Sequence, residues 1–303
     1  MAERFSDQKF LSGNFAPIRF EADAPDLEIE GDFPESLRGT LYRNGPNPQF
    51  SPRDRYHIFS GDGMIHAFSI ADGRVSYRNR WVRTNKWKLE NAAGRALFGT
   101  FGNPMTTDPS VHGESFNVAN TNILAHGGRL LALEEGNPPF ELAPDSLESI
   151  GPWDFSQRLV GPMTAHPKID PHTGEMLFFG YGLGGMGSPE MRLNVVAADG
   201  TLTRADTFEA PYASMVNDFV VTENWIVFPI FPATMNLERA IAGGPPIAWE
   251  PDRTSRLGLL RRDRPIEELR WIEAEACYVF HPCLLYTSPS PRDLSTSRMP
   301  SSA

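Results

Sequence analysis

Short runs of apolar or alternating residues, separated by turn residues, follow one another from Gly39 to His281. Three of these runs contain a glycine turn between strand-like residues: ADGR at 71–74, HGGR at 126–129 and ADGT at 198–201. Asp-Gly and Gly-Gly turns of this kind are the strongest short-range signal for a β-hairpin. Because the hairpins recur without alternating helical patterns, the sequence predicts an all-β sandwich, barrel or propeller. No repeat of fixed length decides among these architectures.

Segments outside the hairpins have other patterns. Residues 1–38 look like a loop-rich N-terminal segment, and a short helix is predicted near 234–242, ending at Gly243. Residues 284–303 are rich in Ser, Pro and Arg without a strand pattern, which predicts disorder. That string also resembles a translated sequencing adapter, so we expect a non-native tail that takes no part in the fold. The expected organisation is an N-terminal segment at 1–38, a β domain at 39–283 and the tail.

Composition and charge narrow the class of protein. The chain has 303 residues, of which 40% are hydrophobic, and it contains 26 Gly and 27 Pro. A helical bundle does not tolerate so many helix breakers. The formal net charge of −10 argues against a nucleic-acid partner, because binding to phosphates needs a basic face.

Cellular location is predicted from the cysteines and from the lack of long apolar segments. The start has no apolar stretch of signal-peptide type, and no run of about 18 apolar residues occurs that would span a membrane. Cys277 and Cys283 are expected to be free thiols in a reducing compartment. We therefore expect a cytoplasmic protein, for which peripheral contact with lipid is one way to collect an apolar substrate.

The seven histidines are the residues with the most scope for metal chemistry. Neither an HExxH pair nor a CxxC pair is present, so a metal site must be assembled from distant strands. A site of neutral imidazoles would suit Fe, Zn, Cu or Ni. The hydrolase motif GxSxG and the phosphate-binding P-loop motif are absent, and the glycine-rich stretch at 180–187 is interpreted as a turn because no helix pattern follows it.

Several longer blocks resemble the carotenoid cleavage oxygenase family, in that family's order. They are GTLYRNGPNPQF at 39–50, FSGDGMIHAFSI at 59–70, NVANTNILAHGGRLLALEEGNPPFEL at 117–142, TAHPKIDPHTGEMLFFGY at 164–181, VNDFVVTENWIVFP at 216–229 and CYVFHPC at 277–283. The resemblance implies a seven-bladed β-propeller with Fe(II) on its axis, held by four histidines from four blades. Full-length members are longer than this chain, so it implies an incomplete seven-bladed propeller at 39–283.

Carried over residue by residue, the resemblance implies an incomplete set of iron ligands. His166, in TAHP, occupies the first ligand position, and His281, in VFHP, the third. Asn217, in VNDF, is a degenerate ligand position where the family has its second histidine, and the fourth ligand is missing. An amide oxygen is a weaker donor than imidazole, so we expect little iron binding. Glu135, in LALEEG, matches an outer glutamate that orients an iron-binding histidine, here with Asn217 as its expected partner.

The same resemblance implies an Fe(II)-dependent dioxygenase that uses O2 to cleave a conjugated C=C bond of a carotenoid or apocarotenoid to two carbonyl products. This fragment is itself expected to be inactive. The stilbene-cleaving branch is an alternative, although its substrate-gripping tyrosine and lysine correspond here to Phe101 and Glu134. A non-catalytic propeller that binds a partner or an apolar ligand is a further alternative, and Asn217 favours it.

Other aromatic and histidine residues are less specific. Phe101, Phe140, Trp153 and Phe179 are candidates for a substrate tunnel, although aromatic residues at this density are more often part of the core. The remaining histidines are expected to be structural or surface residues: His57, His66, His112, His126 and His172.

Overall fold

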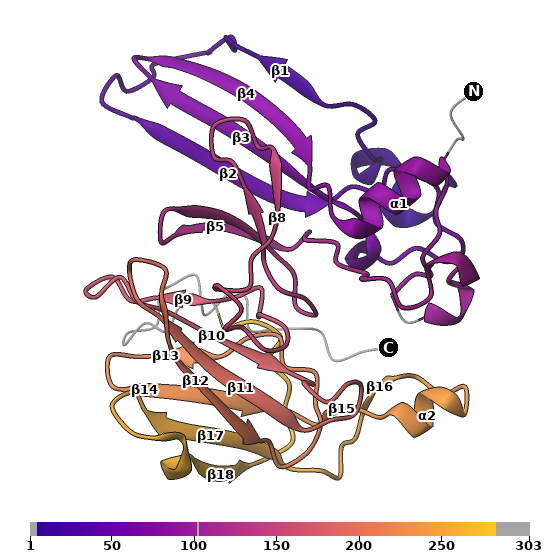
Figure 1. Cartoon of the computed structure of the whole chain (residues 1–303), viewed down its shortest axis with the longest axis vertical. Coiled ribbons are helices and arrows are strands. Elements are labelled where there is room, and N and C mark those ends of the chain that lie inside the picture. Colours follow the sequence, from indigo (N-terminus) through magenta and orange to yellow (C-terminus); the bar gives the residue numbers. More distant parts are fainter. Residues whose placement is uncertain (1–4, 102, 283–303) are drawn as a thin grey trace.

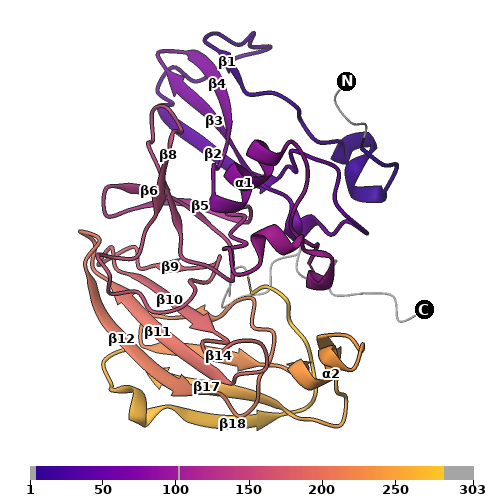
Figure 2. The same ribbon diagram turned by 45° about the vertical axis from the view of Figure 1, so that its right-hand side comes forward.

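The computed structural model describes residues 5–101 and 103–282, whose main elements are four four-stranded sheets that follow one another along the chain. From the first sheet at the top of Figure 1 to the fourth at the bottom, their order in space follows the sequence, and Figure 2 shows the same succession. Successive four-stranded antiparallel sheets are typical of propeller blades. The predicted all-β class is confirmed, whereas closure into seven blades stays a prediction.

The strands of each sheet pair antiparallel. The first sheet has the order β1-β4-β3-β2, with β1 at Ala22–Ala24, β2 at Gly39–Pro46, β3 at Gly63–Ala71 and β4 at Arg74–Trp81. The second has the order β5-β6-β7-β8, with β5 at Asn122–His126, β6 at Arg129–Leu133, β7 at Phe140–Leu142 and β8 at Ser149–Pro152.

The third and fourth sheets are built in the same way. The third has the order β12-β11-β10-β9, with β9 at Lys168–Ile169, β10 at Met176–Tyr181, β11 at Glu190–Val196 and β12 at Leu202–Glu209. The fourth has the order β13-β14-β17-β18, with β13 at Val220–Val221, β14 at Trp225–Ile230, β17 at Ser255–Arg261 and β18 at Arg270–Ala274. A separate hairpin pairs β15 at Ala233–Met235 with β16 at Ile247–Trp249.

Helices are few and short. They are α1 at Asn85–Ala93, α2 at Leu237–Ile241 and single 3-10 turns at Lys9–Leu11, Gly13–Phe15, Ile58–Ser60, Pro104–Thr106, Pro109–Val111 and Ile266–Glu268. The helix predicted near 234–242 is confirmed as α2, which begins later than predicted because β15 occupies the residues before it. No helix within 5–101 and 103–282 is both long and apolar enough to cross a membrane.

Two of the predicted glycine turns are tight, two-residue hairpins. Asp72 and Gly73 connect β3 to β4 with φ of 52° and 71°, and Gly127 and Gly128 connect β5 to β6 with φ of 56° and 75°. Positive φ at both positions gives the turn the twist that the flanking strands need. The third turn is longer: β11 ends at 196 and β12 begins at 202, with Gly200 at φ 90° and an irregular register beside it.

The N-terminal segment contributes a strand that its loop-rich sequence did not predict. Strand β1 pairs with β4, which has no other partner on that side. Ala22 N donates to the side-chain oxygen of Asn79 at 2.6 Å. Asp23 forms ion pairs with Arg78 and Arg80, both on β4. Charge complementarity with a distant strand, rather than local propensity, therefore makes this segment extended.

The hydrophobic core consists of layers between consecutive sheets. On β10, Leu177 and Phe179 pack toward the fourth sheet, while Met176 and Phe178 pack toward the second. Strand β6 divides in the same way between the first and third sheets. Because successive side chains of a strand point to opposite faces, a strand that is covered on both faces reads as a continuous apolar run. This explains the runs LLAL and MLFF in the sequence.

Side-chain amides connect neighbouring sheets. Asn44 on β2 donates through Nδ2 to the carbonyl oxygen of Ala119 at 2.8 Å. Asn122 on β5 donates in the same way to Ala165 at 2.8 Å. Ala119 precedes the second sheet and Ala165 precedes the third, so each bond joins an edge strand of one sheet to the segment that leads into the next.

The structure describes only part of the C-terminal region for which the sequence made predictions. Cys277 is a free thiol, as predicted, and its backbone N donates to Ser255 Oγ at 3.1 Å, which anchors this segment to β17. Cys283 and the predicted tail at 284–303 lie outside the described residues.

Helix α1 carries a buried ionic cluster. Lys86 Nζ lies 2.8 Å from both Asp62 Oδ1 and Glu90 Oε2, and all three side chains are buried. Burial alone would lower the pKa of Lys86, but the two carboxylates raise it above its usual value, so this lysine is protonated. Glu90 also accepts hydrogen bonds from the backbone N of Leu97 and Phe98, at 2.8 and 3.1 Å. The cluster therefore joins the first sheet, the helix and the segment that follows it.

Lys86→Met is expected to lower the free energy of unfolding by about 3–5 kcal/mol, because two buried carboxylates would lose their counter-charge. The matched control is Lys88→Met on the exposed side of the same helix, which should change stability by no more than about 0.5 kcal/mol. Urea denaturation at neutral pH measures both. Similar losses for the two substitutions would show that the buried cluster has no special importance for stability.

Candidate metal centre

His166 lies just before β9, where the chain enters the third sheet. Its backbone N donates to Thr164 Oγ1 at 3.2 Å. The Thr164 hydroxyl donates in turn to the carbonyl oxygen of Asn217 at 3.3 Å, and Thr164 N donates to the carbonyl oxygen of Phe179 at 2.8 Å. Thr164 therefore attaches the loop of His166 both to its own sheet and to the loop that precedes the fourth sheet.

Asp218 is a carboxylate buried at this junction, with 2% of the residue exposed. Its Oδ1 accepts a hydrogen bond from Phe219 N at 2.8 Å and lies 2.8 Å from Lys168 Nζ. Its Oδ2 lies 2.8 Å from His281 Nδ1. Because Lys168 is on β9 and Asp218 precedes β13, this ion pair joins the third sheet to the fourth.

His281 follows β18 and approaches the same point from the end of the fourth sheet. The centre of its ring lies 4.5 Å from the centre of the His166 ring. The carbonyl oxygen of the preceding residue, Phe280, accepts a hydrogen bond from Asn217 Nδ2 at 2.9 Å. The His281 side chain is 41% exposed, so the site is open to solvent on this side.

Donor atoms of His166, Asp218 and His281 all lie within 4.8 Å of one another. Within residues 5–101 and 103–282, this is the only group of three or more His, Cys, Asp or Glu residues close enough to share a metal ion. The structure therefore brings together both histidines that the sequence singled out and adds a carboxylate that it did not. Asp218 directly follows Asn217 in the VNDF string, but no feature of the sequence singled it out.

The surroundings of His166 favour a neutral imidazole. Burial lowers its pKa, the Asp218 carboxylate opposes that effect, and the charges of His281 and Lys168 lower the pKa further. The side chain of Asn217 has a smaller, raising effect. The net shift is downward, and the neutral ring is the form that binds metal ions.

Glu135 lies two residues beyond β6 and accepts a hydrogen bond from the Tyr181 hydroxyl at 3.1 Å. Burial raises the pKa of Glu135 to about 7; the Tyr181 hydrogen bond opposes the shift, and the nearby Glu134 and Asp218 carboxylates add to it. The side-chain amide of Asn217, its expected partner, instead donates to a backbone carbonyl. The role of Glu135 as an outer support of the metal site thus stays a prediction.

The aromatic residues considered for a tunnel lie in different environments. Phe140 and Phe179 are packed inside the hydrophobic layers between sheets, which accounts for their burial without a tunnel. Trp153 lies under an arginine guanidinium at 3.7 Å from its ring centre. Phe101 is 44% exposed and packs edge-on against Phe59 at 5.3 Å between ring centres.

Histidines outside the metal group have other contacts or lie on the surface. His66 Nδ1 lies 2.7 Å from the Tyr77 hydroxyl, and His126 Nε2 lies 2.9 Å from a backbone carbonyl. His57 accepts a hydrogen bond from a backbone N, and His112 and His172 are exposed. The expectation that these residues are structural or surface groups is confirmed.

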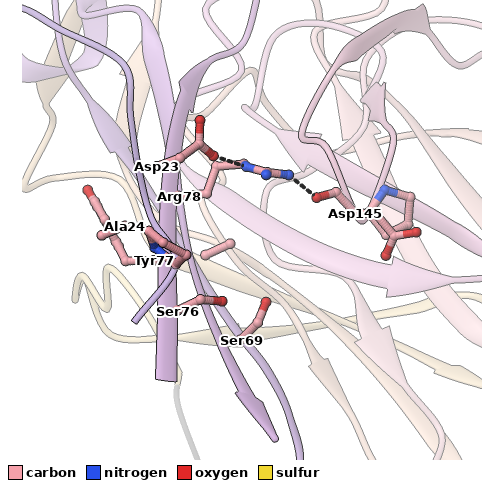
Figure 3. A pocket seen from close by; sticks show the side chains of 10 residues that line it. Asp23, Ala24, Ser69, Ser76, Tyr77, Arg78 and Asp145 are labelled. Carbon is pink, nitrogen blue, oxygen red and sulfur yellow. Dashed lines mark hydrogen bonds and ion pairs between the residues drawn. The ribbon is translucent and has the colours of Figure 1, made fainter. Parts of the chain in front are cut away.

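A cavity of about 310 Å³ lies away from His166 and His281, between the first sheet and the loop that follows β7. Figure 3 shows Arg78 in this cavity, contacting the carboxylate of Asp23 and the backbone carbonyl of Asp145. Ser69, Ser76 and Tyr77 complete much of its polar lining. None of its lining residues belongs to the candidate metal group, and such a polar, charged lining does not suit an apolar substrate.

One protein family and its members match most of this chain. The family described as retinal pigment epithelial membrane protein matches residues 15–298. Isoeugenol monooxygenase from Pseudomonas nitroreducens is 43% identical over 272 residues, which are 89% of this chain and 57% of that protein. The chain therefore spans somewhat more than half the length of this relative.

Two solved structures are similar over nearly the same region. Lignostilbene dioxygenase from Pseudomonas brassicacearum aligns with a TM-score of 0.85 at 38% identity, over 90% of this chain and 57% of that one. An apocarotenoid oxygenase variant from Synechocystis aligns with a TM-score of 0.75 at 31% identity, over 88% of this chain and 58% of that one. Identities above 30% over most of the chain support common ancestry as well as a common fold.

Stability of the metal-free protein should fall as the pH rises from about 4.5 to about 7. The pKa of Glu135 is raised above its usual value of 4.5, so the folded state holds this proton more tightly than the unfolded state does. The contribution is fully present below pH 4.5 and is lost as the pH passes about 7. Its full size is on the order of 3 kcal/mol.

Glu135→Gln should remove this titration, so that its free energy of unfolding depends less on pH between 5 and 8. Urea denaturation in the presence of a chelator measures the difference, with Glu148→Gln, at an exposed position just before β8, as the control. Parallel pH profiles for the unmodified chain and Glu135→Gln would show that Glu135 titrates normally.

Proposed function

The chain belongs to the retinal pigment epithelial membrane protein family, whose relatives are named oxygenases, and from this membership we propose that it is the iron-binding part of an enzyme that cleaves a conjugated C=C bond with O2. The family match over most of the chain is the observation that carries this proposal. Because the chain spans only 57% of the relative named above, the complete reaction is proposed for the whole protein rather than for these residues alone.

Members of this family are non-heme iron enzymes, and the donor groups described above are compatible with such an ion. We propose that His166 and His281 bind Fe(II) through neutral imidazoles. Asn217 is proposed to stand at the second ligand position, and a fourth ligand is expected from the part of a full-length protein that this chain does not include. Bound iron would supply the redox chemistry by which O2 reacts with the alkene.

The proposed reaction needs O2 as its only co-substrate. The C=C bond of the substrate breaks, two C=O bonds form, and each of the two carbon atoms takes one oxygen atom. The residues of this chain are proposed to bind and orient the metal. Glu135, which accepts a hydrogen bond from Tyr181, is proposed as an outer support that stabilises the site without touching the ion.

A carotenoid or apocarotenoid is one proposed substrate class. Two positions favour it: Phe101 has no hydroxyl, and Glu134 has a carboxylate in place of an amine. Burial raises the pKa of Glu134, and the backbone N of Gly136 donates to this carboxylate at 2.9 Å. A residue held in this way is poorly suited to grip a phenolate as a lysine would.

An aryl alkene is the second candidate class, and sequence similarity favours it. Isoeugenol monooxygenase is 43% identical to this chain and lignostilbene dioxygenase 38%, compared with 31% for the apocarotenoid oxygenase. If this similarity reflects substrate choice, a different set of side chains must replace the tyrosine and lysine of the stilbene-cleaving branch.

We also infer that the four sheets are consecutive blades of a larger propeller, with residues 39–283 belonging to one domain. Three features support this: the four-stranded antiparallel sheets, the hydrophobic layers between them and the similarity to carotenoid oxygenases, which are propellers. Seven blades are proposed from the resemblance alone.

The function is tested in a chimera that joins this chain, up to residue 283, to the remaining C-terminal part of the Pseudomonas brassicacearum relative. Products from an apocarotenoid, a stilbene and isoeugenol are identified by mass spectrometry. We expect paired carbonyl products from at least one substrate and no products from His166→Ala. A chimera that binds iron but cleaves none of these alkenes would overturn the proposed reaction and leave the metal site intact.

Asn217→His in the chimera should strengthen Fe(II) binding by at least about 10-fold, because it supplies an imidazole at the second ligand position and even outer-shell groups change metal affinity by 10–100-fold. Anaerobic equilibrium dialysis measures the affinity, with Asn122→His at the amide between the second and third sheets as the control for the substitution itself. Equal affinity of the Asn217 parent and Asn217→His would mean that position 217 is not a ligand position.

A further inference from the structure

At the point where the resemblance predicts several imidazoles, the described residues place two imidazoles and one buried carboxylate. We propose that Asp218 Oδ2 is a direct ligand of the metal ion, beside His166 and His281. This inference rests on the proposed function only in assigning a metal ion to the two histidines. It differs from the four histidines that the resemblance implies, because the ligands of this chain become two histidines and one carboxylate.

The distance between Asp218 Oδ2 and His281 Nδ1 is compatible with two ligands on one ion. These atoms are 2.8 Å apart. Two donors at this separation, each about 2.1 Å from a metal ion, subtend an angle of roughly 85° at the ion. That angle is close to the 90° between neighbouring positions of an octahedron. A donor atom of His166 lies within 4.8 Å of a donor atom of each of the other two residues, close to the roughly 4.2 Å that separates opposite ligands of one ion.

The state of Asp218 Oδ2 supports a cation at this point. Among the described residues this buried oxygen accepts no hydrogen bond, although His281 Nδ1 lies 2.8 Å away. A buried charged oxygen without a partner is costly and rare in proteins. A metal ion between Oδ2 and the two rings would satisfy it.

The other oxygen of Asp218 is held in place. Lys168 Nζ and Phe219 N both contact Oδ1 at 2.8 Å, so the carboxylate cannot easily rotate. Ligating carboxylates are usually oriented by hydrogen bonds of this kind. With Oδ1 occupied, Asp218 would bind through one oxygen only, which leaves positions on an octahedral ion open for O2 or water.

Asn217 is not needed as a ligand in this arrangement. Its Nδ2 donates to the carbonyl oxygen of Phe280, in the same way that Asn44 and Asn122 donate to carbonyl groups of the next segment. The amide at 217 therefore positions the segment that carries His281. Two histidines and one carboxylate with open positions are the ligand set of many non-heme Fe(II) oxygenases.

The test uses the 303-residue chain and Co²⁺ as the probe, followed by its visible absorption, so that no catalytic activity is required. Asp218→Asn should weaken Co²⁺ binding about 10–100-fold and change the absorption spectrum. Asp170→Asn is the matched control, because it removes a largely buried carboxylate from an ion pair with Arg262 at 2.6 Å, outside the candidate metal group. The control should bind Co²⁺ as the unmodified chain does.

A double-mutant cycle separates direct ligation from an indirect effect. If Asp218 only orients His281, Asp218→Asn should cost nothing further in a His281→Ala background. If it is a ligand, the double variant should bind Co²⁺ more weakly than His281→Ala alone. The first result, or unchanged binding by Asp218→Asn itself, would overturn the proposal.

Asp218→Glu covers the case in which the Asn variant does not fold. It keeps the charge beside Lys168 and moves the carboxylate by one methylene group. We expect weaker Co²⁺ binding with an altered spectrum, and an unaltered spectrum and affinity would contradict direct ligation. If the Co²⁺ results are as expected but the chimera cleaves no alkene, the proposed reaction is contradicted and ligation by Asp218 is not.

Discussion

Burial of the Asp218 carboxylate is the constraint on which the candidate metal centre depends. A charge removed from water is tolerated only with a counter-charge and hydrogen bonds, which Lys168 and the backbone of Phe219 supply here. Because Lys168 is on β9 and Asp218 precedes β13, their contact sets how closely the third and fourth sheets approach. His166 lies two residues before Lys168, so the same contact brings its ring to the carboxylate and to His281.

Side-chain amides apply a related constraint at successive junctions. In each case an asparagine donates to a backbone carbonyl of another segment: Asn44 to Ala119, Asn122 to Ala165 and Asn217 to Phe280. The amide of Asn217 therefore has a structural function. It holds the segment that carries His281 in the loop geometry around the candidate metal group.

Local patterns were reliable where both ends of an interaction lie close together in the chain. The turns at Asp72 and at Gly127 were predicted, because positive φ is needed within the turn itself. Continuous apolar runs on β6 and β10 indicated strands covered on both faces. Strand β1 and helix α1 were missed, since β1 depends on charges on β4 and α1 on the partnership of Lys86 with Asp62.

For the candidate site, the sequence by itself determined the all-β class, the order of the family's blocks and the two candidate ligands, His166 and His281. These follow from short motifs that are complete within a few residues. Only the tertiary structure decided that Asp218 faces both rings and that Asn217 bonds to the carbonyl of Phe280. Whether a carboxylate points to solvent or to a histidine depends on how adjacent sheets pack. Contacts such as that of Lys168 with Asp218, 50 positions apart in the chain, set that packing.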